Sequence, residues 1–188
     1  MVRWIHPHRL ICMQDQLSEL VVLSCCVDIV HKGVADILFR PMEERDSARI
    51  HDIHTDCIML SLGKHYTSLQ IRTWLEGRSP YGYLYGAMTG ENYLVAEQEG
   101  LLVAFISWRG DELRSLFVCP ERQQSGIGSL LLRCDDRLAD VKYVQATLNA
   151  VGFYGKFGFE PVSSGYVEKR GVRIPYMHMR KPDVHPTH

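Results

Sequence analysis

The sequence lacks the features that mark most specialised classes of protein. No apolar run reaches the roughly 18–20 residues that a membrane span needs, and the longest one, at 20–30, is interrupted by Asp28. The formal net charge is −1, and Lys and Arg are spread along the chain, so there is no basic arm for nucleic acid or a membrane surface. These absences favour a globular protein, which we expect to be cytoplasmic and without nucleic-acid or membrane partners.

Cysteine pairs with metal or redox spacing are also lacking. The chain has no CxxC pair, so we expect reduced and mostly buried thiols. His51 and His54, followed by Asp56 and Cys57, are the arrangement that comes nearest to a metal site. No second cluster completes a four-ligand set, so a helix packed on the core explains these residues better, and we predict no metal. Nothing in the sequence places a base, such as His178, beside Cys119, which argues against a thiol nucleophile.

What is present is a regular alternation of elements that suits one domain, since 188 residues are few for two full cores. This alternation begins only near Asp36. We therefore expect residues 1–35 to be an N-terminal extension that is loosely attached, residues 36–182 to be the domain, and residues 183–188 to be a short tail.

The hydrophobic pattern predicts a mixed α/β (α+β) fold. The expected helices are 44–62, 68–77 with Ser68 as the N-cap, 126–139 and 150–158, and residues 78–90, rich in Gly, Pro and Tyr, are expected to form a loop. The expected strands are 37–41, 93–98, 101–108, 112–119, 143–148, 160–168 and 173–180, with hairpin turns at Glu99-Gly100 and Arg170-Gly171. Hairpins combined with a strand-helix-strand crossover predict one mixed sheet of about seven strands, flanked by helices on both faces.

The most informative segment is the polar turn at 123–129, which follows a strand and opens a helix. Its glycines let the backbone approach a ligand, and the free N–H groups of a first helical turn attract an anion such as pyrophosphate. The segment is neither a Walker loop nor a complete dinucleotide fingerprint. By itself, a plain tight turn explains it about equally well.

A second segment lies about 25 residues further on: Asn149, and then the run 153–159 (FYGKFGF). Together the two segments resemble the GNAT superfamily of N-acetyltransferases. The family's Gln/Arg-x-x-Gly-x-Gly/Ala signature corresponds to Gln123, Gly126 and Gly128, and its later FYxKxGF segment corresponds to 153–159. The resemblance covers roughly residues 36–182. One departure is Gln124, where the family often has glycine.

This resemblance implies acetyl-CoA as the acetyl donor and direct transfer to an amine. It implies that Tyr154 is the general acid that protonates the departing thiolate. A purely packing role beside Phe153 and Phe157 is the alternative. The cofactor contacts that the resemblance implies are Leu116, Phe117 and Val118 for the pantetheine arm, Gln123, Gln124, Ser125, Gly126, Ile127, Gly128 and Ser129 for the pyrophosphate, and Asn149 and Tyr154 near the arm.

The acceptor side is less defined. Glu112 is the best-placed carboxylate for a general base, although a solvated charge at a strand end explains it as well. Tyr66, Trp74 and Tyr83 lie in the region that forms the acceptor side in GNAT proteins, and we expect them to contact a small-molecule or peptide amine. A non-catalytic acyl-CoA-binding module is the alternative function, and a homodimer is left open.

Overall fold

The computed structural model describes residues 37–182. The expected extension at 1–35 and the expected tail at 183–188 lie outside these residues, so both boundaries stay predictions. Within the described part of the chain, no helix is both long and apolar enough to cross a membrane.

The strands form one mixed sheet of seven in the order β1-β2-β3-β4-β5-β7-β6, which confirms the predicted fold class. The pairing is antiparallel throughout except between β4 and β5, which run parallel. The strands are β1 (Ile37–Pro41), β2 (Asn92–Gln98), β3 (Leu101–Arg109), β4 (Glu112–Val118), β5 (Tyr143–Ala146), β6 (Glu160–Lys169) and β7 (Val172–Arg180).

Two tight hairpins form at the predicted dipeptides. Glu99 and Gly100 have φ values of 54° and 76°, and Arg170 and Gly171 have φ values of 51° and 75°. Two successive residues with positive φ are the signature of a type I′ turn, whose twist matches that of the flanking strands. These turns join β2 to β3 and β6 to β7.

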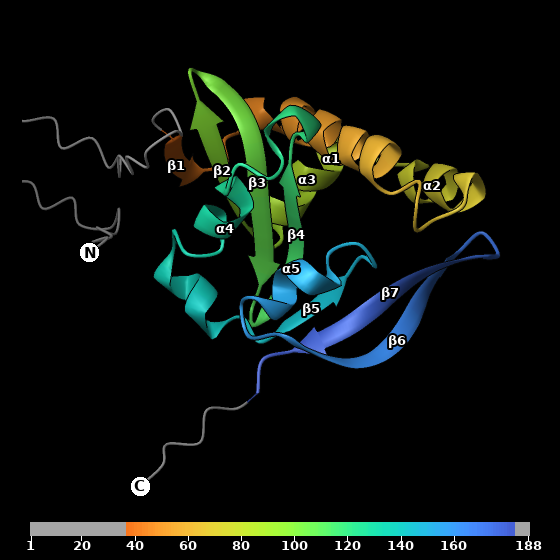
Figure 1. Cartoon of the computed structure of the whole chain (residues 1–188). Coiled ribbons are helices and arrows are strands. Elements are labelled where there is room, and N and C mark those ends of the chain that lie inside the picture. The colour runs from red at the N-terminus through yellow and green to blue at the C-terminus, as the bar shows by residue number, and fades with distance from the viewer. Residues whose placement is uncertain (1–36, 183–188) are drawn as a thin grey trace, which may run out of the picture.

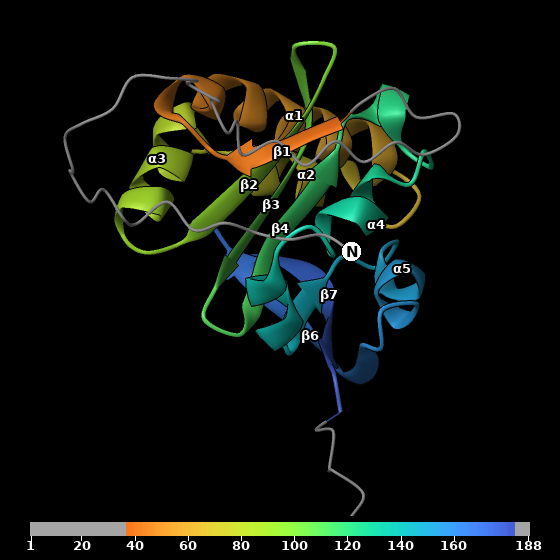
Figure 2. The ribbon, with the colours of Figure 1, turned by 90° about the vertical axis from the view of Figure 1, so that its left-hand side faces the viewer.

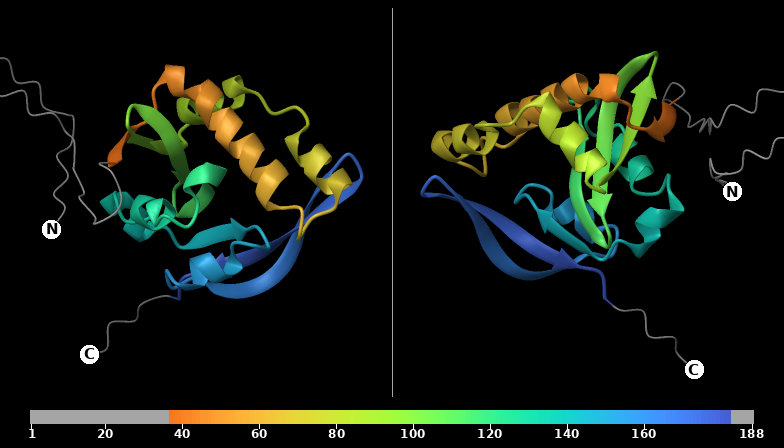
Figure 3. Two further views of the ribbon diagram at one scale, coloured as in Figure 1. Left: turned by 45° about the horizontal axis from the view of Figure 1, so that its top comes forward. Right: turned by 180° about the vertical axis from the view of Figure 1, so that it is seen from behind.

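Helices cover both faces of the sheet, as predicted. Figures 1 and 2 show α1 (Ser47–Ser61) and α3 (Pro80–Met88) on one side of β2–β4, and α4 (Ile127–Leu131) on the other. α2 (Ser68–Leu75) lies beside the β6–β7 hairpin in both views of Figure 3, and α5 (Val151–Gly155) precedes β6. Short 3-10 helices occur at Glu44–Asp46, Pro120–Arg122 and Asp136–Asp140.

The core lies on both faces of the central strand β3, seven of whose nine residues are buried. Phe105 and Ile106 are fully buried there, and Ile50 and Ile53 of α1 are fully buried in the same cluster. The 3.6-residue pattern predicted that Ile50 and Ile53 face the core, and they do, whereas Leu60, which the same pattern included, is 69% exposed.

One prediction was wrong in kind: the expected loop at 78–90 contains the helix α3. Pro80 occupies the first helical turn, a position that favours proline because its missing N–H has no partner there anyway. Tyr83 faces inward, whereas Tyr81 and Tyr85 are exposed. Gly86 also faces inward, and a Cβ there would lie 2.8 Å from the Tyr93 hydroxyl. Close packing, rather than a loop, accounts for this glycine.

Other predictions were wrong in extent. The single helix expected at 126–139 ends at Leu131, and a separate 3-10 turn follows at Asp136–Asp140. The buried Asp135 starts that second turn by accepting a hydrogen bond from the N–H of Arg137 at 2.9 Å. The cap of α2 is Thr67 rather than Ser68. Its hydroxyl accepts from the N–H of Gln70 while the Gln70 side chain accepts from the N–H of Thr67, which makes a capping box.

Candidate active site

The site begins where β4 and β5 part. The two strands pair only at their first residues, Glu112 with Tyr143 and Leu113 with Val144. Beyond Leu113, β4 stays paired with β3, but within 37–182 no strand pairs with its other edge. A groove of about 580 Å³ opens along this edge.

The free edge of β4 presents only some of its backbone groups to the groove. The N–H of Cys119 donates to the C=O of Val103 in β3 at 2.8 Å. Neighbouring residues in an antiparallel ladder face opposite edges, so the groups of Val118 and, two residues earlier, Leu116 face the groove.

The carbonyl of Val118 already has partners inside the chain. It accepts hydrogen bonds from Gln123 Nε2 at 3.1 Å and from the Cys57 thiol at 3.0 Å. Gln123 Nε2 also donates to the Ser61 hydroxyl at 3.2 Å, which ties the turn to α1. The backbone groups of Leu116 and the N–H of Val118 are therefore left for a ligand, and Gln123 shapes the groove with its side chain.

The turn at 123–129 holds a row of free donors. The N–H of Gln123 donates to Pro120, and that of Ser129 donates to Gly126. The five N–H groups between them, from Gln124 to Gly128, make no hydrogen bond within the described residues. Consecutive N–H groups in such a concave turn form a site for an anion.

Positive φ angles shape this turn. Gln124 has φ 63°, and Gly126 has φ 90° as the residue that precedes α4. This conformation is open to glycine and costs other residues about 1–2 kcal/mol. A Cβ at Gly128 would instead make ordinary contact with Phe153 and Val118, at 3.5 and 3.6 Å. Gly126 is thus required by the backbone, whereas the position of Gly128 has room for a methyl group.

The opposite wall of the groove carries Tyr154, the predicted general acid. Its ring is buried between Phe153 and Phe159, with centroid distances of 5.2 and 5.8 Å. Burial raises the pKa of Tyr154 well above the usual value for a phenol, so the hydroxyl keeps its proton at neutral pH. Tyr154 lines the groove, and its hydroxyl makes no hydrogen bond within the described residues.

Most of the predicted cofactor residues meet in this groove. Ser125 does not line it, because its hydroxyl donates to the C=O of Arg122 at 2.6 Å. Sequence reasoning missed Cys57, Arg122, Thr147 and Lys156, of which Lys156 lay within the recognised FYxK segment. The predicted residues that line the groove are Leu116, Phe117, Val118, Gln123, Gln124, Gly126, Ile127, Gly128, Ser129, Asn149 and Tyr154.

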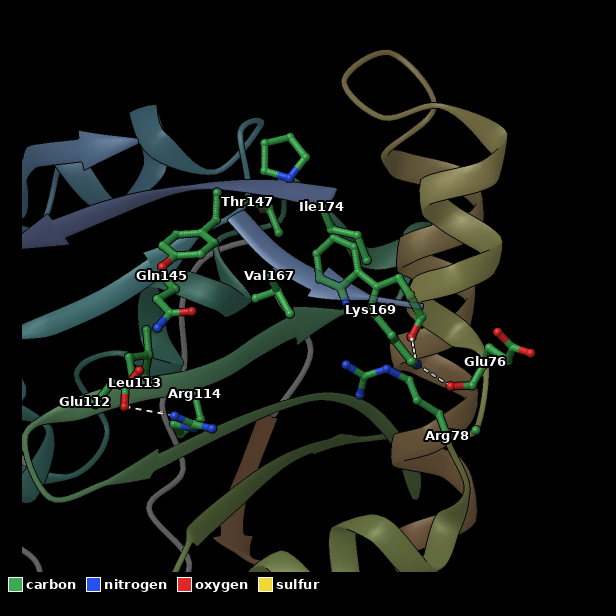
Figure 4. A pocket seen from close by; sticks show the side chains of 14 residues that line it. Glu76, Arg78, Glu112, Leu113, Arg114, Gln145, Thr147, Val167, Lys169 and Ile174 are labelled. Atoms are coloured by element: carbon green, nitrogen blue, oxygen red, sulfur yellow. Dashed lines mark hydrogen bonds and ion pairs between the residues drawn. The ribbon is translucent and has the colours of Figure 1, made fainter. Parts of the chain in front are cut away.

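A second hollow, of about 450 Å³, lies between β4, α2 and the β6–β7 hairpin (Figure 4). Thr147 lines both this hollow and the groove, so the two approach each other at the end of β5. Glu112 lines the second hollow and pairs with Arg114 at 2.9 Å. The structure therefore brings the predicted base and the predicted acid to adjoining spaces.

The three predicted acceptor residues fall in different places. Trp74 lines the second hollow, and Tyr83 lines a neighbouring one of about 350 Å³. Tyr66 lines neither and is buried. Its hydroxyl donates to the C=O of Pro175 at 2.9 Å and accepts from the N–H of Leu148 at 3.0 Å, so it holds the wall of the hollow in place.

The histidines and cysteines set aside above lie as follows. His54 is buried and stacked on Phe117 at 4.1 Å, and residues 37–182 contain no group of three or more His, Cys, Asp or Glu arranged to hold a metal ion. Burial raises the pKa of the Cys119 thiol, which opposes a role as a nucleophile. His178 stacks on Tyr143 in the sheet, with centroids 6.1 Å apart.

Comparison with known proteins identifies the family. The sequence profile described as Acetyltransferase (GNAT) domain matches residues 63–181. The uncharacterized N-acetyltransferase YafP of Escherichia coli K12 is 26% identical over 151 residues, which cover 80% of this chain and 99% of that protein.

Solved structures share the fold. A GCN5-related N-acetyltransferase from Rhodopseudomonas palustris has a TM-score of 0.72 at 23% identity, over 81% of this chain and 99% of that one. The PaiA N-acetyltransferase of Thermoplasma acidophilum, solved with coenzyme A, has a TM-score of 0.60 at 19% identity, over 78% and 99% of the two chains. The profile match, which spans more than half of the sequence, shows that the chain belongs to the GNAT acetyltransferase family.

Proposed function

We propose that this acyltransferase moves the acetyl group of acetyl-CoA to a primary amine by direct transfer, with both substrates bound at once. One observation carries the proposal. The free N–H groups at 124 and 126–128 and the protonated phenol of Tyr154 belong to residues that line one groove, and that groove adjoins a separate hollow through Thr147. A donor and an acceptor can therefore be bound together, each in its own space.

The groove suits coenzyme A in its chemistry. The free N–H groups at 124–128 would bind the pyrophosphate, and the N–H and C=O of Leu116 would bind the amide groups of the pantetheine arm. Gly126 keeps the phosphate end open, since a Cβ there would have no atom within 4 Å. When bound, acetyl-CoA supplies the acetyl group as a thioester.

Tyr154 and Glu112 would then handle the protons. The thiolate of coenzyme A needs a proton as it leaves. The phenol of Tyr154 holds one at neutral pH, as an ordinary phenol does, and burial raises its pKa further. The attacking amine must lose a proton, and Glu112, which lines the second hollow, would accept it directly or through water. Arg114 pairs with this carboxylate, so an amine that reaches Glu112 would share the carboxylate with Arg114 or displace it.

Release of free coenzyme A from acetyl-CoA in the presence of an amine panel tests the proposal. Tyr154→Phe should lower kcat about 100-fold, the lower end of the usual contribution of a positioned acid, with acetyl-CoA affinity nearly intact. Tyr143→Phe, outside the groove, is the matched control. Unchanged turnover of Tyr154→Phe across the pH range would refute the acid role. Binding of acetyl-CoA without release for any amine would instead support the non-catalytic module.

A further inference from the structure

Arg78 is a cation without a counter-ion in the second hollow. It follows α2 and lines both this hollow and the neighbouring one that contains Tyr83. Figure 4 shows its side chain extending from the α2 end into the hollow, toward the pair of Glu112 and Arg114. The residue is half-buried, and within 37–182 no carboxylate lies within ion-pair distance of it.

The other charged groups around this hollow are occupied. Glu112 pairs with Arg114, and Glu76 pairs with Arg170. The ammonium of Lys169 donates to the backbone carbonyls of Trp74 and Glu76. Arg78 and Lys169 therefore both bring a positive charge to the hollow with no carboxylate of residues 37–182 within ion-pair distance, and Glu91 lies in the neighbouring hollow that Arg78 also lines. Arg78 is the one of the two with a buried nitrogen that has no hydrogen-bond partner among the described residues.

Neutral groups orient Arg78 and leave its charge in place. Its Nη1 donates to Nδ1 of His54 at 3.4 Å, and the same Nδ1 accepts from the Tyr83 hydroxyl at 2.9 Å. Burial, followed by the charge of Arg78 itself, lowers the pKa of His54 well below its usual value, so the imidazole is uncharged. The buried Nε of Arg78 has no hydrogen-bond partner within the described residues. The guanidinium is held in position but is not neutralised.

The rest of the hollow is partly apolar. Trp74, Leu113, Val167 and Ile174 line it together with the charged groups, and Ile174 is 6% exposed. An apolar or aromatic side chain would fit against these residues. A volume of about 450 Å³ is in the range of small-molecule pockets.

From this arrangement we propose that the acceptor is an α-amino acid with an apolar side chain, whose carboxylate binds Arg78 while its amine faces the groove. The inference rests on the proposed function and names the substrate class of the same site. The positive charge of Arg78 attracts an anion, and its planar fork matches the two oxygens of a carboxylate. An amine without an acidic group would leave Arg78 unpaired.

Matched acceptors test the proposal: L-phenylalanine with its amide and phenethylamine, and L-leucine with its amide and isoamylamine. For the wild type, kcat/KM should be at least about tenfold higher for each acid than for its amide, because a charge-assisted hydrogen bond is lost in the amide. Arg78→Gln should bring the acid and the amide within about twofold by raising KM for the acid alone, and Arg78→Lys should retain part of the preference.

Arg72→Gln is the control, because Arg72 lies on α2, six residues before Arg78, but is exposed and does not line the hollow. It should keep the wild-type ratio. Equal use of acids and amides by the wild type, or an unchanged ratio in a folded Arg78→Gln, would overturn the inference and leave the proposed function standing.

Failure of the proposed function gives a different result. If no compound releases coenzyme A, calorimetry with N-acetyl-L-phenylalanine and its amide decides the matter. Tighter binding of the acid that Arg78→Gln abolishes would keep Arg78 as a carboxylate site without turnover. Equal binding of the two, or no binding of either, would overturn the inference as well.

Discussion

Gly126 and Gly128 lie two residues apart in the turn, and replacing each with alanine should change the free energy of unfolding in opposite directions. Gly126 has φ 90° and ψ −9°, whereas Gly128 lies in the first turn of α4 without a positive φ. Gly126→Ala places an alanine in a left-handed backbone conformation, which costs about 1–2 kcal/mol. Alanine also lowers the conformational entropy of the unfolded chain, which offsets about 0.4–1 kcal/mol of that cost. We expect a net loss of about 1 kcal/mol, or roughly 2–4 °C in Tm.

Gly128→Ala should instead stabilise the protein by about 0.5 kcal/mol, because alanine is the better helix former. Its methyl group would meet Phe153 and Val118 at 3.5 and 3.6 Å, which is ordinary van der Waals distance. Urea unfolding measures both variants against the wild type. The backbone argument is refuted if Gly126→Ala is as stable as the wild type, or if Gly128→Ala loses as much stability as Gly126→Ala.

The same pair separates stability from ligand binding. A methyl at Gly126 would have no protein atom within 4 Å, so it would project into the space beside the free N–H groups. We therefore expect weaker acetyl-CoA binding for Gly126→Ala and nearly unchanged binding for Gly128→Ala, both measured by calorimetry. A larger side chain at Gly126 should weaken binding further. Wild-type affinity in such a variant would contradict the assignment of this turn to the phosphates.

Three further predictions concern the scaffold. Tyr66→Phe removes a hydroxyl that joins two backbone groups and should cost about 1–3 kcal/mol in urea unfolding, while Tyr81→Phe, on an exposed ring, should cost little. Burial raises the pKa of Cys57 to about 12, so iodoacetamide at pH 8 should alkylate it far more slowly in the folded than in the unfolded protein, and equal rates by mass spectrometry would contradict this. Burial by itself would raise the pKa of Asp46, but hydrogen bonds from Arg40 and from the N–H of Glu43, together with the charges of Arg40 and Arg45, hold the pKa below its usual value. Because the pKa of Asp46 is lower in the folded state, its pair with Arg40 stabilises the protein fully above about pH 4 and less as the pH falls below that value. Asp46→Asn should therefore reduce the loss of unfolding free energy that the wild type shows below about pH 4.

The sequence by itself determined the elements whose signals are local. Two apolar runs separated by a turn dipeptide placed β2 and β3. The dipeptides Glu99-Gly100 and Arg170-Gly171 fixed the β2–β3 and β6–β7 turns because glycine favours the positive φ that a type I′ turn needs. The cofactor side was local too, since Gln123 to Ser129 form one continuous turn. The turn by itself predicted no more than an anion site, and its resemblance, together with 153–159, to the GNAT signature is what allowed the groove residues to be named.

The tertiary structure decided what depends on contacts distant in sequence. Residues 78–90 contain a helix because Tyr83 and Gly86 pack against groups from α1 and β2, which the local composition does not report. Tyr66 has a structural role because its hydroxyl donates a hydrogen bond to the C=O of Pro175 and accepts one from the N–H of Leu148, two residues that are distant from it in sequence. In the sequence, Arg78 looks like any loop arginine. Only the fold shows that its side chain lines the second hollow and that no carboxylate among the described residues lies within ion-pair distance of it. The donor site draws on two recognisable segments, 116–129 and 149–156, whereas the acceptor site is assembled from α2, β4, β5 and the β6–β7 hairpin, so its chemistry appears only when the chain is folded.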